Sequence, residues 1–153
     1  MVELLRLSEA DSMALHGMAL LAEAGRGRRY WRTQEMAKRL QVSANHLHLV
    51  FARLEKQGLV ESVSGPFGGY RLARPSREIT LLEVYEAMEG KLDPRDCLRD
   101  NRVCHGRHCL LGDFLVKMNR EFHDYLAGAK LSEFKHQYPE GNGGKHEKKN
   151  RKD

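Results

Sequence analysis

Three cysteines carry the most distinctive chemistry in this sequence. Cys97, Cys104 and Cys109 are the only cysteines of the chain, and all lie in the polar segment CLRDNRVCHGRHC. Thiolates that converge in a flexible loop can bind one zinc ion or an iron–sulfur cluster. With a loop histidine, His105 or His108, they would also complete a tetrahedral zinc site. The segment therefore predicts a soft-metal site, with unligated or redox-switching thiols as the alternative.

The composition limits the class of protein. The chain has 153 residues, 41% of them apolar, which suits one compact domain with an additional element or tail. Its net charge of +5 permits a polyanionic partner but does not require one. No apolar stretch is long enough to span a bilayer, and the N-terminus lacks a basic segment followed by an apolar run. We therefore expect a cytoplasmic protein without a membrane partner, in which an odd cysteine count argues against structural disulfides.

The first part of the chain predicts three helices. Their expected starts are Ser8, Thr33 and Ser43, and their expected ends are Ala24, Leu40 and Gly58. Ser8 and Asp11 have the spacing of a capping box, Ser43 is a preferred N-cap residue, and the second helix breaks at Gln41 and Val42. Two short helices joined by a tight turn indicate a helix-turn-helix.

A β-hairpin is expected directly after the third helix. Leu59–Val63 reads as a short strand, residues 64–69 are rich in turn residues, and Tyr70–Leu72 reads as the partner strand. A hairpin in this position is the wing of a winged helix. A capping box of Thr80 and Glu83 then begins a helix that stops at Gly90.

The last predicted long helix runs from Leu111 to Gly128 and has a wide apolar stripe. The stripe consists of Phe114, Leu115, Met118, Phe122, Tyr125 and Leu126. A long amphipathic helix outside a small domain usually buries its stripe against another subunit, so we expect a homodimer. A last short helix starts at Ser132. The predicted fold class is mainly α with a small β-hairpin: a winged helix-turn-helix domain plus a long C-terminal dimerisation helix.

These elements predict four segments along the chain. They are a winged helix-turn-helix DNA-binding domain at 1–90, a cysteine loop at 91–110, the dimerisation helix and short C-terminal helix at 111–138, and a disordered tail at 139–153. An enzyme is not expected. The chain has no Ser/His/Asp set and no HExxH spacing, and GPFGG precedes a strand where a phosphate-binding loop would precede a helix.

The order of the elements and three motifs carry a family resemblance. The motifs are LEKQGLVESVSGPFGGYRLAR around the hairpin, the helix ITLLEVYEAMEG, and the cysteine trio before the long helix. Over about residues 5–135 the chain resembles the winged-helix bacterial regulators that include IscR, the nitric-oxide sensor NsrR and the cysteine regulator CymR. The resemblance implies a homodimer whose recognition helices enter successive major grooves of a palindromic DNA operator. It further implies that the long helices form the dimer interface.

The resemblance also favours one reading of the cysteines. Family members with such a trio bind a [2Fe-2S] or [4Fe-4S] cluster, which implies Cys97, Cys104 and Cys109 as ligands, with zinc as the alternative. The spacing of six and four intervening residues differs from the nearly even family pattern. The implied function is a transcriptional regulator, most simply a repressor, whose cluster senses iron, redox state or nitric oxide. The alternative is a zinc-stabilised or thiol-based winged-helix regulator or binding module without a cluster.

The fourth ligand has several candidates. In one family branch a histidine follows the third cysteine by three positions, but Gly112 stands there in this chain. In other branches an acidic residue or histidine on the partner subunit's first helix serves, and those places fall near Ser12 and on His16. We expect His16 first, then Asp11, and then the loop residues His105 and His108.

Contacts to DNA are expected from both the helix-turn-helix and the hairpin. The candidates for phosphate contacts are Thr33, Gln34, Ser43 and Arg53, and those for reading bases are Ala44, Asn45 and His48. The glutamate and glutamine common in the family at the positions of His48 and Leu49 are absent, so we expect a different operator. In the hairpin, Ser64 replaces the arginine that often enters the minor groove; Arg71 is expected to take over, and Arg74 to contact phosphate.

Overall fold

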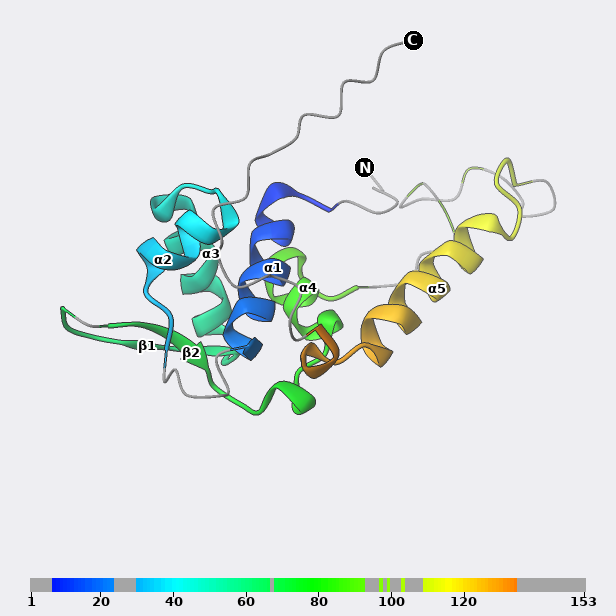
Figure 1. Ribbon diagram of the computed structural model, residues 1–153. Coiled ribbons are helices and arrows are strands. Elements are labelled where there is room, and N and C mark those ends of the chain that lie inside the picture. Colours follow the sequence, from blue (N-terminus) through cyan, green and yellow to red (C-terminus); the bar gives the residue numbers. More distant parts are fainter. Residues whose placement is uncertain are drawn as a thin grey trace, which may run out of the picture.

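The computed structural model describes residues 7–23, 30–66, 68–92, 97, 99, 103 and 109–134. In chain order its elements are α1 (Glu9–Glu23), α2 (Thr33–Leu40), α3 (Ala44–Lys56), β1 (Val60–Val63), β2 (Gly69–Leu72), the 3-10 turn η1 (Ser76–Glu78), α4 (Leu81–Glu89), α5 (Phe114–Gly128) and the 3-10 turn η2 (Leu131–Phe134). The protein is mainly helical with a two-stranded hairpin, as predicted. Figure 1 shows the hairpin on the side of α2 and α3, and α5 on the opposite side. None of the helices in these ranges is long and apolar enough to cross a membrane.

Helix α1 lies at the centre of the fold and packs against α2, α3, α4 and η2. The predicted capping box is confirmed, since Ser8 N–H donates to Asp11 Oδ2 at 2.7 Å and Asp11 N–H donates to Ser8 Oγ at 3.1 Å. Gly17 lets α3 approach closely, because a Cβ at this position would lie 2.7 Å from the ring of Phe51. A small residue at this crossing therefore sets how closely α3 packs against the core.

The helix-turn-helix has the predicted turn but one different cap. Gln41 has φ 57°, and Val42 N–H donates to Ala37 O at 3.0 Å, so the chain reverses directly after α2. Ser43 caps α3 as predicted, accepting a hydrogen bond from His46 N–H. The N-cap of α2 is Arg32, where Thr33 was expected, because Met36 N–H already bonds to Arg32 O at 3.0 Å.

The two strands of the hairpin, here called the wing (Val60–Leu72), pair antiparallel from Val60 opposite Leu72 to Val63 opposite Gly69. Leu59, expected in the first strand, instead closes the end of α3 by donating its N–H to Leu54 O at 3.0 Å. Trp31 extends the sheet by pairing with Tyr70 of β2. Trp31 and Tyr70 exchange two backbone hydrogen bonds of 2.8 Å each, so the wing is attached to the chain before α2.

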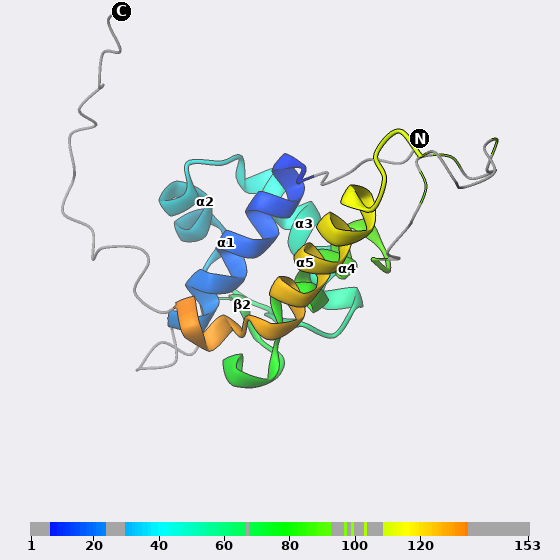
Figure 2. The ribbon, with the colours of Figure 1, turned by 90° about the vertical axis from the view of Figure 1, so that its right-hand side faces the viewer.

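The C-terminal helices pack onto the same core. The Thr80–Glu83 capping box of α4 is confirmed. Helix α5 lies along α4, where the rings of Phe122 and Tyr85 pack edge to face at a centroid distance of 5.4 Å. Figure 2 shows this pairing of α4 and α5. The long helix begins at Phe114, later than the expected Leu111, because the residues before it form a turn with Phe114 N–H bonded to Leu111 O.

The apolar stripe of α5 is divided between two surroundings. Leu115 and Leu126 are buried within this chain, whereas Phe114 is 56% and Tyr125 62% exposed. The expected last short helix is η2, beginning at Leu131. Its first side chain is fully buried in the core that α1, α3 and α4 share, so the chain returns to the winged-helix core after α5.

Candidate DNA-binding surface and cysteine segment

Helix α3 presents a polar and partly apolar face to solvent. Its inner face is formed by the buried side chains Leu47, Val50, Phe51 and Leu54. The predicted residues Asn45 and His48 lie on the exposed side, as does Arg53. Ala44 differs from the expectation, because this first helical residue is half-buried against the hydrophobic core and does not share the exposed face.

Two further residues belong to this exposed face and were not among the sequence candidates. His46 is exposed beside Asn45, and Leu49 is 64% exposed although it is a large apolar side chain. The position of Leu49 four residues after Asn45 places both on one side of a helix, and that spacing could have identified it. Together these side chains offer hydrogen-bonding groups and a methyl surface, the two kinds of group that read base edges in the major groove.

A polar contact joins the exposed face of α3 to the wing. Tyr70 Oη lies 2.9 Å from His48 Nδ1, and the Tyr70 ring packs on Phe51 with a centroid distance of 4.8 Å. Burial, together with the negative charge of Glu55, raises the pKa of the Tyr70 hydroxyl. The phenol therefore keeps its proton at neutral pH and is available as a hydrogen-bond donor.

A second contact ties the C-terminal end of α3 to the first strand of the wing. Glu55 Oε1 accepts from both Ser62 Oγ at 2.6 Å and Ser62 N–H at 2.9 Å. The bond from the Ser62 hydroxyl lowers the pKa of Glu55 most, and the bond from the Ser62 N–H lowers it further. Both bonds keep the carboxylate ionised. Through Tyr70 and Ser62, the wing is thus fixed relative to α3.

The expected phosphate contacts lie at the ends of α2 and α3. Gln34 is exposed and Thr33 half-buried in the first turn of α2, and Ser43 is exposed although its hydroxyl caps α3. Ser64 is exposed in the turn of the wing. Backbone N–H groups at helix N-termini favour anions, so the starts of α2 and α3 suit phosphate oxygens.

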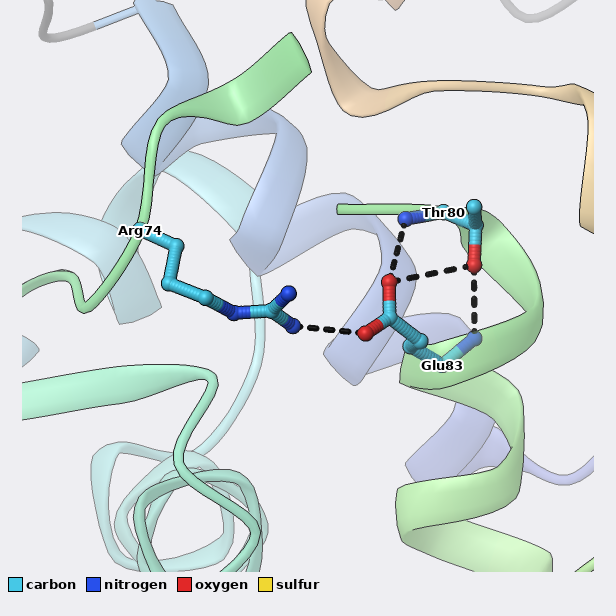
Figure 3. A network of polar contacts seen from close by, with 3 residues as sticks. All are labelled: Arg74, Thr80 and Glu83. Atoms are coloured by element: carbon cyan, nitrogen blue, oxygen red, sulfur yellow. Dashed lines mark hydrogen bonds and ion pairs between the residues drawn. The ribbon is translucent and has the colours of Figure 1, made fainter. Parts of the chain in front are cut away.

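Both wing-side arginines have carboxylate partners within the chain. Arg71 donates to Glu61, its cross-strand neighbour, through Nε and Nη2 at 2.8 Å. Arg74 donates through Nη2 to Glu83 at 2.6 Å, inside the network that also contains the Thr80 cap (Figure 3). If either arginine contacts the minor groove or a phosphate, its guanidinium is shared between the DNA and its own carboxylate partner.

Two of the three cysteines lie in the described part of the chain. Cys97 is half-buried and Cys109 exposed, and both are free thiols. Cys109 O accepts from Gly112 N–H at 3.1 Å, in the turn that leads into α5. Cys104, His105 and His108 lie outside the described residues. Within the residues that are described, no three His, Cys, Asp or Glu side chains gather closely enough to hold a metal ion.

The two candidate ligands on α1 differ in accessibility. His16 is exposed and lines a hollow of about 480 Å³ together with Arg39 and Gln41 at the end of α2. Asp11 is fully buried: its Oδ2 accepts from Ser8, and its Oδ1 has no hydrogen-bond partner among the described residues. Asp11 therefore acts as a buried cap, whereas His16 is presented at the surface.

A helix-turn-helix with a wing at its end and an exposed polar face on the second helix defines a winged-helix DNA-binding protein. The chain belongs to the Rrf2 family, whose model, described as an iron-dependent transcriptional regulator, matches residues 7–137. It is accordingly a transcriptional regulator and not an enzyme.

Known relatives agree with this assignment. The chain is 34% identical over 108 residues to a protein of Neisseria meningitidis serogroup A that is provisionally named an HTH-type transcriptional regulator, covering 71% of this chain and 73% of that one. It is 47% identical over 55 residues to IscR of Cereibacter sphaeroides, which covers 36% of each chain.

Solved structures share the fold. The structure of CymR, the global cysteine regulator of B. subtilis, matches with a TM-score of 0.69 at 23% identity over 83% of this chain and 93% of that one. The structure of T. potens IscR matches with a TM-score of 0.66 at 26% identity over 84% of each. The winged-helix fold expected from the sequence is thereby confirmed.

Proposed function

We propose that this Rrf2-family regulator is a cytoplasmic homodimer that represses transcription from a palindromic operator and whose affinity for DNA is set by an iron–sulfur cluster. The observation that carries the proposal is the position of Cys109. Its carbonyl closes the turn into α5, and α5 packs on α4, which contacts both α1 and the recognition helix α3. A ligand on this cysteine is thus connected to the DNA-reading helix through packed elements.

The donor set fits such a cluster. Cys97 and Cys109 are free thiols, and Cys104 lies between them in the sequence, so three soft thiolates are available from one segment. These three residues would hold a [2Fe-2S] or [4Fe-4S] cluster, which supplies one-electron redox chemistry when bound. The same thiolates with His105 or His108 would suit zinc, which is the alternative.

The fourth ligand is proposed to be His16 of the partner subunit. Its imidazole is exposed on α1, so a loop from a second chain has access to it. Asp11 is the weaker candidate because both of its oxygens are buried and one of them caps α1. His105 and His108 are the remaining alternatives.

Control of DNA binding requires two states with different operator affinities, and coupling of about 1–3 kcal/mol is typical. Here the packing of Phe122 on Tyr85 supports the proposal, because it would transmit a change in the orientation of α5 to α4. α4 contacts α3, so the two recognition helices of a dimer would change their relative position. The geometry of a palindromic operator is sensitive to that position, because half-sites have a fixed spacing.

The DNA-binding mode places α3 in the major groove. Asn45, His46, His48 and Leu49 would face base edges there, with Gln34, Thr33, Ser43 and Arg53 near phosphates. The wing, with Ser64 at its turn and Arg71 on its second strand, would lie over the neighbouring minor groove.

The test begins with anaerobic purification, followed by iron, acid-labile sulfide and visible absorbance measurements. An operator is then obtained by in vitro selection, and its affinity is compared for cluster-loaded protein, metal-free protein, Cys104→Ala and Cys109→Ala. Val103→Ala, in the same segment but without a thiol, is the matched control. We expect the two cysteine variants to lose the cluster and to bind like the metal-free protein.

Two outcomes would contradict the proposal. A colourless protein with one tightly bound zinc ion per chain would support the zinc-stabilised alternative. Equal operator affinities in all four preparations would exclude control by a cluster, even if one is bound.

A further inference from the structure

The hydrogen bond between the wing and α3 joins Tyr70 to His48, and which of the two groups donates depends on the tautomer of the imidazole. His48 lies on the exposed face of α3, whereas Tyr70 is only 4% exposed, and 2.9 Å separate Tyr70 Oη from His48 Nδ1. No other hydrogen-bond partner of the Tyr70 hydroxyl lies among the described residues. If the hydroxyl is to use its proton, it must donate to His48 Nδ1.

The direction of this bond determines whether Nε2 of His48 carries a proton and can donate it to a neighbouring group. A neutral imidazole that accepts at Nδ1 carries its proton on Nε2, and a protonated imidazole carries one there as well. In both states Nε2 is a donor. Without the tyrosine hydroxyl, neutral His48 would be free to take either tautomer and to rotate its ring.

The position of Tyr70 is fixed well enough to hold His48 in one tautomer and one ring orientation. Its backbone exchanges two hydrogen bonds of 2.8 Å with Trp31, and its ring packs on the buried ring of Phe51. Its cross-strand partner is Ser62, which is bonded to Glu55 on α3. The hydroxyl thus approaches His48 from a support that is connected to both the core and the recognition helix.

We infer that Tyr70 is a positioning residue for DNA recognition, which holds His48 as a fixed hydrogen-bond donor toward an acceptor on a base edge. The inference rests on the proposed placement of α3 in the major groove. The acceptors that such a donor fits are purine N7, guanine O6 and thymine O4, and it does not fit the amino groups of cytosine and adenine. A residue of the wing thereby contributes to sequence specificity without touching the base.

Tyr70→Phe tests the inference, because phenylalanine keeps the ring that packs on Phe51 and removes only the hydroxyl. Affinity is measured for the selected operator, for its three single-base variants at each position, and for unrelated DNA. We expect Tyr70→Phe to lose about threefold to tenfold discrimination at one base pair per half-site, as one hydrogen bond would supply. His48→Ala should lose the preference at the same base pair, and the double variant should lose no more. Tyr30→Phe makes the same chemical change at a half-buried tyrosine ahead of α2, to which the DNA-binding mode gives no role, and should bind like the wild type.

Nitrogen-15 NMR of the histidine side chains provides a second test in the unmodified protein. We expect His48 to carry its proton on Nε2 in the wild type and to show mixed tautomers in Tyr70→Phe. Unchanged base preferences in Tyr70→Phe, an equal loss of affinity for all sequences, or a proton on Nδ1 in the wild type would overturn the inference and leave the proposed function standing. A protein that selects no DNA sequence would instead overturn the DNA-binding mode itself.

Discussion

Arg74 donates a 2.6 Å hydrogen bond to Glu83, the same carboxylate that accepts from Thr80 at the start of α4 (Figure 3). The arginine follows the second strand of the wing, so this contact connects the wing to the N-terminal end of α4. The ion pair therefore joins the end of the wing to the helix on which α5 packs.

The Arg74 contact predicts that this side chain stabilises the fold more than it binds DNA. Arg74→Ala should lower the free energy of unfolding by roughly 0.5–1 kcal/mol, a modest value because the side chain is 40% exposed. The salt dependence of operator binding should be unchanged. Arg53→Ala, an exposed arginine on α3, is the comparison and should reduce the slope of log affinity against log salt by about one. A reduced slope for Arg74→Ala would show that it contacts phosphate after all.

The network around Glu83 predicts a pH dependence of stability. Burial raises the pKa of Glu83, but the hydrogen bonds from Thr80 and Arg74 outweigh it, so the pKa lies below its ordinary value of 4.5. A lowered pKa means that the folded state favours the ionised form, so the contribution is complete above pH 4.5 and is lost as the pH falls below that value. Urea midpoints of wild type and Glu83→Gln should therefore converge in this acid range. Glu121→Gln, exposed on α5, is the control, and a constant gap between wild type and Glu83→Gln would contradict the expectation.

The contact of the wing with Trp31 predicts that a methyl group added at Gly69 strongly lowers stability. A Cβ on Gly69 would lie 2.0 Å from Trp31 O, so Gly69→Ala must push the second strand away from the chain before α2. We expect a loss of about 1–3 kcal/mol in unfolding free energy and weaker operator binding. Gly128→Ala, where a Cβ meets nothing within 4 Å at the end of α5, should be neutral or slightly stabilising. Equal thermal midpoints for the two variants would refute this.

Leu49 predicts a contact with a thymine methyl group. An exposed leucine on the recognition face offers no hydrogen bond, but apolar side chains pack on the methyl group that distinguishes thymine in the major groove. Replacing single thymines of the selected operator by uracil should weaken wild-type binding several-fold at one position per half-site. Leu49→Ala should bind both DNAs alike, whereas Ala52→Ser on the same helix should keep the difference. Equal binding of thymine and uracil DNA by the wild type would rule the contact out.

The exposed part of the α5 stripe predicts the dimer interface. Phe114→Ser should shift the protein toward the monomer in sedimentation velocity, because this half-exposed ring adds little to the core of its own chain. Lys117→Ser, one turn further along the helix, should leave the distribution unchanged. A wild type that is monomeric at micromolar concentration would contradict the dimer.

Local signals in the sequence were sufficient for most of the fold, and contacts between distant residues were not. The caps at Ser8, Ser43 and Thr80 predicted helix starts because each depends on residues three positions apart. Ala44 stands three residues before Leu47, so helical periodicity itself places it toward the buried face, and there it packs against the core. The contact of Tyr70 with His48 joins residues 22 positions apart, and no local pattern announces it. The cysteine trio stands out by residue type alone, whereas the geometry of a proposed site there depends on chain positions that spacing does not determine.

The return of the chain to the core at η2 has a mechanical consequence. Leu131 N–H bonds to Ile79 O, and Leu81 N–H bonds to Ala129 O, so the end of α5 is fastened on both sides of the start of α4. The end that follows Cys109 has no such pair of backbone bonds within the described residues. The C-terminal end of α5 is therefore held by backbone hydrogen bonds beside the start of α4, whereas near Cys109 the helix is held by side-chain packing, with Leu115 buried.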